Sequence, residues 1–255
     1  MGQYIPLDAP VHRWDSRSKI VAVTGLSVSM IIAPDWPHVA MVSVVILVLI
    51  ALSKINLRTY LVNLRILLIL VFITAFLQLL LVPGQAVFTA WLISVTREGL
   101  IAASLLFVRL TGILLLAAWL TFTTRPAQLT AGLERIFSPL ARLRLPVHEL
   151  VMIMTLSLRF LPLLVEETQR IQRAQLARGA AWHQGTLRQK GHYLIALLVP
   201  MLRLSLQRAE DLAEAMENRG YHGGQGQTPL YSQGLHPGDW LLIALTMVIL
   251  VFQLI

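Results

Sequence analysis

The 255-residue sequence lacks cysteine altogether and is poor in charged residues. Without cysteine, the chain can form neither a disulfide bond nor a site of thiol chemistry. Only 13% of its residues are charged, about half the share found in soluble proteins. Hydrophobic residues make up 56% of the chain, and the mean hydropathy is +0.69. This composition indicates an integral membrane protein.

Catalytic motifs are missing as well. The sequence has no Walker loop, no Gly-x-Ser-x-Gly turn and no His-Glu-x-x-His pair, because His148-Glu149 is not followed by a second histidine at the required spacing. Glu166 and Glu167 are neighbours on an expected helix, so their carboxylates do not face each other and a solvated face is favoured. We therefore predict that the chain is not an enzyme and has no catalytic residue, cofactor or metal site of its own.

The charge that is present is mostly positive, with a formal net charge of +8. In a membrane protein such an excess marks cytoplasmic segments. Nucleic-acid binding is disfavoured, because no basic stretch carries interleaved aromatic residues for base stacking. Residues 1–19 contain neither an apolar core nor a small-residue cleavage site, so they are not typical of a signal peptide. Asp15 or Ser16 is suited to cap a helix that starts nearby.

Two short apolar runs come next, at residues 20–33 and 38–53, separated by Pro34-Asp35-Trp36-Pro37. The two prolines predict a turn there. As a helix, residues 20–33 reach about 21 Å, which is less than the roughly 30 Å hydrocarbon core of a bilayer. The pair forms either two short spans or one re-entrant hairpin. Both alternatives return the chain to its starting side.

Three further runs are expected to span the membrane. Residues 66–82 lead outward, Pro83-Gly84 breaks the run, and residues 99–122 lead back. The last run, residues 240–255, is uncharged and begins with Trp240 at the interface. Counting the first pair as two, the sequence predicts five spans.

The distribution of positive charge predicts the orientation of these spans. Lys54, Arg58 and Arg65 follow the second run, and short positive segments prefer the cytoplasmic side. The amino end, which is also positive, is therefore expected inside the cell. An odd number of spans then leaves the carboxyl end outside.

Residues 125–238 differ from the rest, because they hold 13 of the 21 Lys and Arg residues and 8 of the 13 Asp and Glu residues. Two stretches in this region, 150–165 and 193–206, are apolar, but each is shorter than the roughly 20 residues of a spanning helix. Each also contains one arginine and one proline. The segment between them, residues 166–192, is positive. The whole region is therefore expected to be cytoplasmic.

Turn signals divide this region into three helices and a linker. A short amphipathic helix is expected at residues 126–142, with Thr124 as a candidate cap and a proline in its first turn. A long helix is expected from Pro146 to about Trp182, where His183-Gln184-Gly185 ends it. A second long helix is expected at about 186–219, and the tract that follows is a linker.

Two similar motifs lie near the ends of these long helices, Ala177-Arg178-Gly179 and Asn218-Arg219-Gly220. Gly220 suits the left-handed position just past a helix end. Two long helices joined by a short turn run antiparallel, so their carboxyl ends point apart. A helix of about 34 residues spans about 50 Å, so the two arginines are expected tens of ångströms apart. Such a pair suits docking to two copies of a partner, because arginine presents a fixed planar fork to carboxylates.

Arg109 lies near the middle of an expected span, where a charge is costly and usually functional. One alternative is that it faces a helical neighbour and pairs with a backbone carbonyl or a carboxylate. The other is that it lines the path of a carrier that binds substrate itself. A membrane-embedded enzyme is the third class considered, and it is disfavoured by the missing motifs.

Four stretches of this sequence resemble one known family. They are GQYIPLDAPVHRWDSRSK at the amino end, FSPLARLRLPVHELVMIMTLSLRFLPLLVEE, AQLARGAAW and LAEAMENRGYHGG. Together they resemble the transmembrane T component of energy-coupling factor (ECF) transporters, the EcfT/CbiQ family. The last two resemble its paired Ala-Arg-Gly motifs, with Asn218 in place of the second alanine. Trp14 and Ser16 stand where leucine and proline are frequent in that family.

The resemblance implies a fold, a set of partners and a location. The expected fold is an all-α integral membrane protein with about five transmembrane helices and long cytoplasmic coupling helices that form a crossed antiparallel pair. The expected partners are two ABC-type ATPase subunits, which bind ATP and Mg²⁺, and a small membrane S component that binds a vitamin or metal ion. The expected location is the prokaryotic cell membrane, with the amino terminus and coupling helices in the cytoplasm.

The resemblance also assigns roles to particular residues. Ala177, Arg178 and Gly179 are expected to dock on one ATPase, and Asn218, Arg219 and Gly220 on the other. Arg109 is expected to support helix packing or contact with the S component. The expected division of the chain is a cytoplasmic segment, four transmembrane helices, a coupling region, a linker and a last transmembrane helix, at residues 1–19, 20–124, 125–222, 223–238 and 239–255.

The absence of cysteine makes the topology directly testable. We predict that a cysteine introduced at Gln184 reacts with a membrane-impermeant thiol reagent only after the membrane is opened, because residues 166–192 are expected inside the cell. The measurement is labelling of whole cells before and after permeabilisation. Labelling of intact cells would contradict the predicted topology.

Overall fold

The structure is a computed structural model that describes residues 5, 7, 9–90, 93–137, 147–179, 187–221 and 236–254. The chain divides into two compact units. The first, here called the bundle unit, comprises residues 2–136 and 231–255, and the second, the helix-pair unit, comprises mainly residues 137–230.

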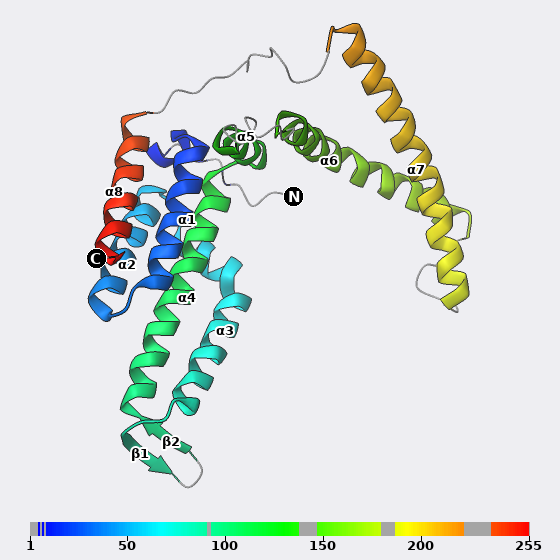
Figure 1. Ribbon diagram of the computed structural model, residues 1–255. Helices are drawn as coiled ribbons and strands as arrows, with labels where there is room; N and C mark the ends of the chain where they lie inside the picture. The colour runs from blue at the N-terminus through cyan, green and yellow to red at the C-terminus, as the bar shows by residue number, and fades with distance from the viewer. Residues whose placement is uncertain are drawn as a thin grey trace. The chain divides into compact units, whose positions relative to one another are not determined.

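The bundle unit is built almost entirely of helices (Figure 1). In chain order these are the 3-10 helix η1 (Pro10–Arg13) and the α-helices α1 (Ser16–Ile32), α2 (Trp36–Leu52), α3 (Leu57–Leu81), α4 (Arg97–Thr123), α5 (Pro126–Phe137) and α8 (Pro237–Leu254). Helix α4 is central, because α1, α2 and α3 all pack against it, while α8 packs against α1. The last helix of the chain thus lies beside the first.

Local sequence signals set where these helices begin. Asp15 caps α1, because its carboxylate accepts a hydrogen bond from the Arg17 backbone N–H at 2.9 Å. Asn56 caps α3 and Thr96 caps α4 in the same manner. The expected cap near Asp15 is confirmed. Helix α3 starts at Leu57, well before the apolar run at residues 66–82, because Asn56 caps it there.

The core of the bundle unit is built from buried residues of α1, α2, α3, α4 and α8, and its large aromatic residues lie on α3 and α4. Trp119 is completely buried, and its indole N–H donates a hydrogen bond to the Leu49 carbonyl oxygen at 3.0 Å. Tyr60 packs edge-on against Phe122, with ring centroids 5.2 Å apart. A buried indole needs such a partner, because an unpaired N–H in an apolar core is costly.

A small β-hairpin at residues 86–96 was not expected from the sequence. Strand β1 (Ala86–Ala90) pairs antiparallel with β2 (Ile93–Thr96), with Ala90 opposite Ile93. The hairpin joins α3 to α4 at the end of the bundle opposite η1 and α5 (Figure 1). Among the described residues, the fold is therefore helical apart from this one connection.

The helix-pair unit contains α6 (Val147–Ala177) and α7 (Leu187–Asn218), which contact each other. Helix α7 lies within a residue or so of its expected bounds. The expected end of α6 at Trp182 is wrong, because the helix stops at Ala177, where Gly179 adopts a positive φ of 88°. The expected turn at residues 183–185 lies outside the described residues, as does the end of the helix expected to reach residue 142.

The apolar surface of the bundle unit is large enough to face lipid. Helices α3 and α4 are long and apolar enough to cross a membrane, with mean hydropathies of 2.6 and 2.3 in their most apolar stretches. Only 17% of each stretch is buried inside the protein, so most of these side chains need an apolar environment outside it. Helices α2 and α8 are also apolar but shorter. The full set of five spans stays a prediction, as does the choice between two short spans and a re-entrant hairpin at residues 20–53.

Close packing between α1 and α8 generates a stability prediction. A Cβ atom on Gly25 would lie 2.5 Å from Cγ2 of the buried Thr246, and a β-branched side chain has little freedom to move away. Gly25→Leu should therefore lower stability by about 1–3 kcal/mol, as overpacking usually does. The measurement is the temperature at which the detergent-solubilised protein loses its monodisperse chromatography peak.

Gly191 provides the matched control, because it is also a helical glycine but a Cβ there would meet nothing within 4 Å. Gly191→Leu should leave the midpoint unchanged or raise it, since leucine favours a helix over glycine by about 0.8 kcal/mol. Equal effects at both positions would contradict the described packing of α1 on α8.

Candidate functional site

The first arginine motif forms the end of α6. The N–H groups of Arg178 and Gly179 donate hydrogen bonds to the Gln175 and Leu176 carbonyl oxygens at 3.1 and 3.0 Å. These bonds tighten the last turn, and Gly179 then takes the left-handed conformation that other residues adopt only with strain. The sequence thus stops the helix directly after the arginine and leaves Arg178 at its carboxyl end.

The second motif ends α7 in the same way and with a fuller set of bonds. The Tyr221 N–H donates to the Met216 carbonyl oxygen at 3.0 Å, and the Gly220 N–H donates to that of Glu217 at 2.9 Å. Gly220 has a φ of 76°. This pair of bonds around a left-handed glycine is a Schellman cap. The left-handed position expected for Gly220 is confirmed, and Arg219 is the cap residue before it.

Both arginines project into solvent. Arg178, Gly179, Arg219 and Gly220 are all exposed, and a Cβ added to either glycine would meet no atom within 4 Å. Among the described residues, neither guanidinium group has a hydrogen bond or an ion pair. Each arginine therefore keeps its five donors available, and the negative end of the helix dipole beside it favours the positive charge.

Helices α6 and α7 cross each other (Figure 1), and the two arginines directly follow their last residues, Ala177 and Asn218. Helices α6 and α7 run antiparallel and touch where Thr168 meets the Met201 sulfur at 3.3 Å and Glu167 meets Arg208. At 1.5 Å per residue, Arg178 lies about 15 Å from this crossing along α6. Arg219 lies more than about 15 Å from it along α7, in the other direction. One small pocket cannot hold both.

A charge pair between Glu167 and Arg208 holds the crossing, although the sequence favoured a solvated position for Glu167. Arg208 Nη2 lies 3.2 Å from Glu167 Oε2, and Arg170 approaches the same oxygen at 3.8 Å. The expectation of a solvated face holds for Glu166, which is exposed, but is wrong for Glu167, whose side chain is only 14% exposed. The spacing of residues in the sequence could have shown that Glu167 faces α7. It continues a row of α6 residues on that face, spaced alternately by four and three: Ile153, Ser157, Phe160 and Leu164.

Arg109 on α4 acts as a cap for a neighbouring helix. Its Nη2 donates to the carbonyl oxygen of Ala33, the residue that caps the carboxyl end of α1, and it lies 3.5 Å from that of Pro34. The last carbonyls of a helix have no partner within it, and a cation there is favoured. The alternative in which Arg109 pairs with the backbone of a helical neighbour is confirmed.

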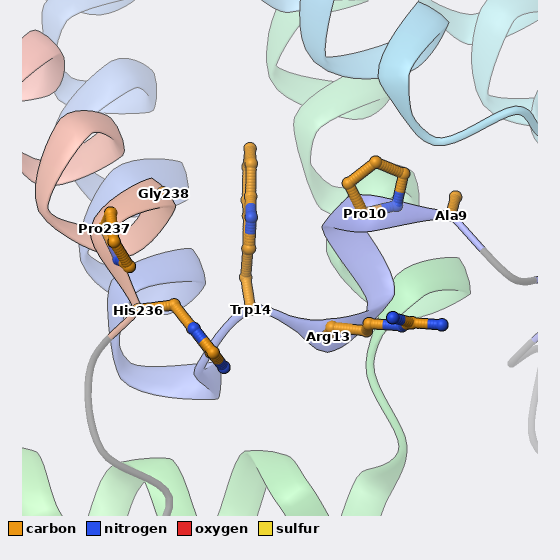
Figure 2. Close-up of a pocket in the computed structure, with 7 residues that line it drawn as sticks. All are labelled: Ala9, Pro10, Arg13, Trp14, His236, Pro237 and Gly238. Carbon is orange, nitrogen blue, oxygen red and sulfur yellow. The ribbon is translucent and has the colours of Figure 1, made fainter.

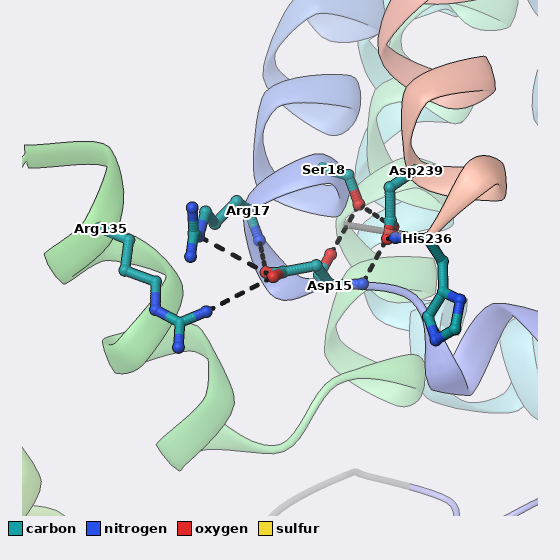
Figure 3. A network of polar contacts seen from close by, with 6 residues as sticks. All are labelled: Asp15, Arg17, Ser18, Arg135, His236 and Asp239. Carbon is teal, nitrogen blue, oxygen red and sulfur yellow. Dashed lines mark hydrogen bonds and ion pairs between the residues drawn. The ribbon is translucent and has the colours of Figure 1, made fainter. Parts of the chain in front are cut away.

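A buried polar cluster surrounds the first turn of α1 (Figure 3). Asp239, at the start of α8, is fully buried, and its Oδ1 accepts hydrogen bonds from the Asp15 backbone N–H at 2.9 Å and from the Ser18 hydroxyl at 2.5 Å. Its Oδ2 accepts from the His236 N–H at 2.8 Å. Asp239 thus joins the starts of α1 and α8, which are more than two hundred residues apart in sequence.

Lys19 completes the cluster on the side of α4. It precedes the apolar run of α1 and is buried, and its Nζ donates to the Thr123 carbonyl oxygen at 3.1 Å. Burial lowers the pKa of Lys19 to about 8, while the charges of Asp239 and Asp15 act in the opposite direction. The sequence alone assigned no role to either Lys19 or Asp239.

A pocket of about 470 Å³ lies beside this cluster, between η1 and the start of α8 (Figure 2). The Trp14 ring stands between Pro10 and Arg13 on one side and Pro237 and Gly238 on the other. A Cβ on Gly238 would lie 2.6 Å from the Trp14 Nε1 atom. Glycine at that position therefore lets the indole close the space between the two segments.

Comparison with known proteins places these features in one family. The family model CbiQ, described as "Cobalt transport protein", matches residues 8–230. The "Energy-coupling factor transporter transmembrane protein EcfT" of Thermanaerovibrio acidaminovorans is 41% identical over 245 residues, which cover 96% of this chain and 91% of that protein. Proteins of the same description from Lactococcus lactis and Clostridium kluyveri are both 38% identical, over 95% and 97% of this chain and 92% and 93% of their own lengths.

The charge pair at the helix crossing generates a second stability prediction. Glu167→Gln should destabilise the contact of α6 with α7 by about 1 kcal/mol, because it leaves the partly buried Arg208 without its nearest carboxylate. Glu166→Gln removes the same charge from the exposed neighbouring position and should have little effect. Thermal unfolding of the purified variants measures both. Equal shifts for the two variants would show that overall charge, rather than the pair, is responsible.

Proposed function

The chain belongs to the CbiQ family of cobalt transport proteins, and on that basis we propose that it is the transmembrane coupling subunit, or T component, of an energy-coupling factor transporter. In this role the chain catalyses nothing itself. Two ABC-type ATPase subunits bind and hydrolyse ATP, and a small membrane S component binds the substrate. The chain passes the motion of the ATPases to the S component.

The observation that carries this proposal is the pair of exposed arginines. Arg178 and Arg219 end the two helices of one crossed antiparallel pair, with left-handed glycines beside them and no side-chain partner among the described residues. Two equivalent projections that point apart suit two copies of one partner. Each guanidinium is proposed to enter a groove on one ATPase subunit, where carboxylates can accept its paired N–H groups.

The small residues beside each arginine support close approach of a partner. Ala177 and Gly179 flank Arg178, and Gly220 follows Arg219. Asn218, where the first motif has alanine, adds a polar group at the second end. We propose that all six motif residues form the two ATPase-docking surfaces, with the arginines as the anchors and the glycines setting the helix ends.

The bundle unit is proposed to lie in the prokaryotic cell membrane. The large apolar surface of α3 and α4 supports this placement, and the positive charges of the chain favour cytoplasmic positions for the amino terminus and for α6 and α7. The transported substrate is proposed to be a vitamin or a metal ion, bound by the S component. ATP and Mg²⁺ are assigned to the ATPases, because this sequence has no phosphate-binding loop.

A carrier that binds substrate through Arg109 is the alternative class, and it has less support. One terminal nitrogen of Arg109 already caps α1, so the group has a structural task in the bundle. No group of three or more His, Asp or Glu side chains suited to a metal ion occurs among the described residues. Arg109 is therefore proposed to maintain helix packing in the membrane.

Replacement of the two arginines tests the proposal directly. Arg178→Ala and Arg219→Ala should each impair uptake, and the double variant should lose its ATPase subunits on purification while inserting normally in the membrane. Removing one side of a buried interfacial charge pair costs roughly 2–5 kcal/mol. The measurements are substrate uptake and co-purification of the ATPases. Wild-type results for the double variant would contradict the proposed docking.

Two controls separate docking from a general effect of charge. Arg173→Ala removes the same charge from an exposed position of α6 away from the helix end, and it should have a much smaller effect. Arg178→Lys and Arg219→Lys keep the charge but lose the planar fork, so they should recover co-purification only in part.

A further inference from the structure

Helix α5 is seated directly on the first turn of α1. A Cβ atom on Gly132 would lie 3.0 Å from Ser16 Cβ and 3.2 Å from Ile20 Cδ1, and the same placement would bring it to 2.6 Å from Ser16 Oγ. Gly132 and Thr130 are both buried, although α5 is short and amphipathic. The absence of a side chain at position 132 is what permits this close contact between the two helices.

An ion pair fastens the same helix one turn further along. Arg135 Nη1 lies 3.5 Å from Asp15 Oδ2. The Asp15 side chain is only 3% exposed and that of Arg135 is 22% exposed, so the pair is largely shielded from water. The carboxylate is fixed in place because its other oxygen accepts the Arg17 N–H of the α1 cap. Figure 3 shows Arg135 reaching across from α5 to this carboxylate.

The first turn of α1, against which α5 packs, is also hydrogen-bonded to α8 and to α4. The backbone N–H of Asp15 donates to Asp239 of α8, and Lys19, one turn along α1, donates to the Thr123 carbonyl oxygen at the end of α4. Residues 15–19 therefore join four helices, α1, α4, α5 and α8, through buried polar contacts. In a chain whose other helix contacts are mainly apolar, this junction gives fixed positions, because hydrogen bonds have defined directions and apolar contacts can slide.

We infer that Asp15, Gly132 and Arg135 are positioning residues that keep α5 fixed to the bundle unit during transport. Among the described helices, α5 is the one that precedes α6 in the chain, so we expect motion of the α6–α7 pair to reach the bundle unit through it. The junction then delivers that push to α1, and through Asp239 to α8. This inference rests on the proposed function, and neither the family match nor the arginine motifs assign these residues a role.

The inference predicts a specific loss, in which ATP is hydrolysed without uptake. Arg135→Gln and Gly132→Leu should keep the ATPases bound and active but lower the substrate taken up per ATP hydrolysed by about tenfold, a coupling loss of about 1.4 kcal/mol. Both quantities are measured on the complete transporter in proteoliposomes. Arg135→Lys, which retains the positive charge, should restore most of the coupling.

Ala131→Leu is the matched control for Gly132→Leu. It places the same leucine side chain at the neighbouring position of α5, but Ala131 is exposed, so the contact with Ser16 is undisturbed. It should couple uptake to ATP hydrolysis as the wild type does. A merely structural role for the junction predicts a different result, in which yield, ATPase rate and uptake all fall together.

A designed disulfide gives the second test. The Cβ positions at residues 16 and 132 are 3.0 Å apart, so a small outward shift of α5 brings them to the roughly 3.5–4.5 Å of a disulfide. The chain has no cysteine of its own. The variant Ser16→Cys with Gly132→Cys adds a Cβ atom at this contact, so its reduced form should couple uptake to ATP hydrolysis less well than the wild type. Its oxidised form should transport about as well as the wild type, because the disulfide holds α5 on α1. Adding Arg135→Gln to this variant should lower the coupling ratio under reducing conditions and leave it intact under oxidising ones.

The outcomes distinguish the inference from the proposed function. If the wild-type chain brings no ATPases with it or supports no uptake, the proposed function fails. If the wild-type complex works but Arg135→Gln and Gly132→Leu retain their uptake per ATP, or the oxidised disulfide variant stops transporting, the junction is not a fixed connection and the inference is overturned.

Discussion

A single buried carboxylate, Asp239, determines how the two ends of the bundle meet. It is fully buried and accepts hydrogen bonds from the start of α1 as well as from the start of its own helix. A buried charge is tolerated only when hydrogen bonds and opposite charges compensate it, and here Lys19 supplies the charge. Polar groups are costly along helices that face lipid. Apart from the Arg109 cap on α1, the polar contacts between helices described above therefore lie mainly at this end of the bundle.

The helix pair has a different basis for its geometry. Antiparallel helices are related locally by a twofold axis perpendicular to both, so the two carboxyl ends are equivalent positions that face in opposite directions. Arg178 and Arg219 occupy these positions, each before a left-handed glycine. An arginine in the middle of either helix would lack this symmetry and the favourable helix dipole. The placement of the arginines thus follows from where glycine ends each helix.

The sequence predicted the features that depend on local signals. Apolar runs located α3 and α4, Asp15 marked the start of α1, and Gly220 marked the end of α7. The features that it did not predict depend on distant residues: Asp239 acts on a helix more than two hundred residues away, and Glu167 is buried by α7. The end of α6 was placed too late, because a single glycine within a helical pattern is often tolerated, and the left-handed turn at Gly179 could not be distinguished from that case.

Taken together, the two units divide the proposed task by their chemistry. The helix-pair unit exposes charge that binds a partner and has few apolar contacts with which to resist a load. The bundle unit has an apolar surface suited to lipid and one rigid polar junction. Motion that enters at an exposed arginine is received by α6 or α7, and α5 precedes α6 among the described helices. Because α5 is held by an ion pair and by the close approach of Gly132 to Ser16, force at this point is expected to move whole helices rather than bend one.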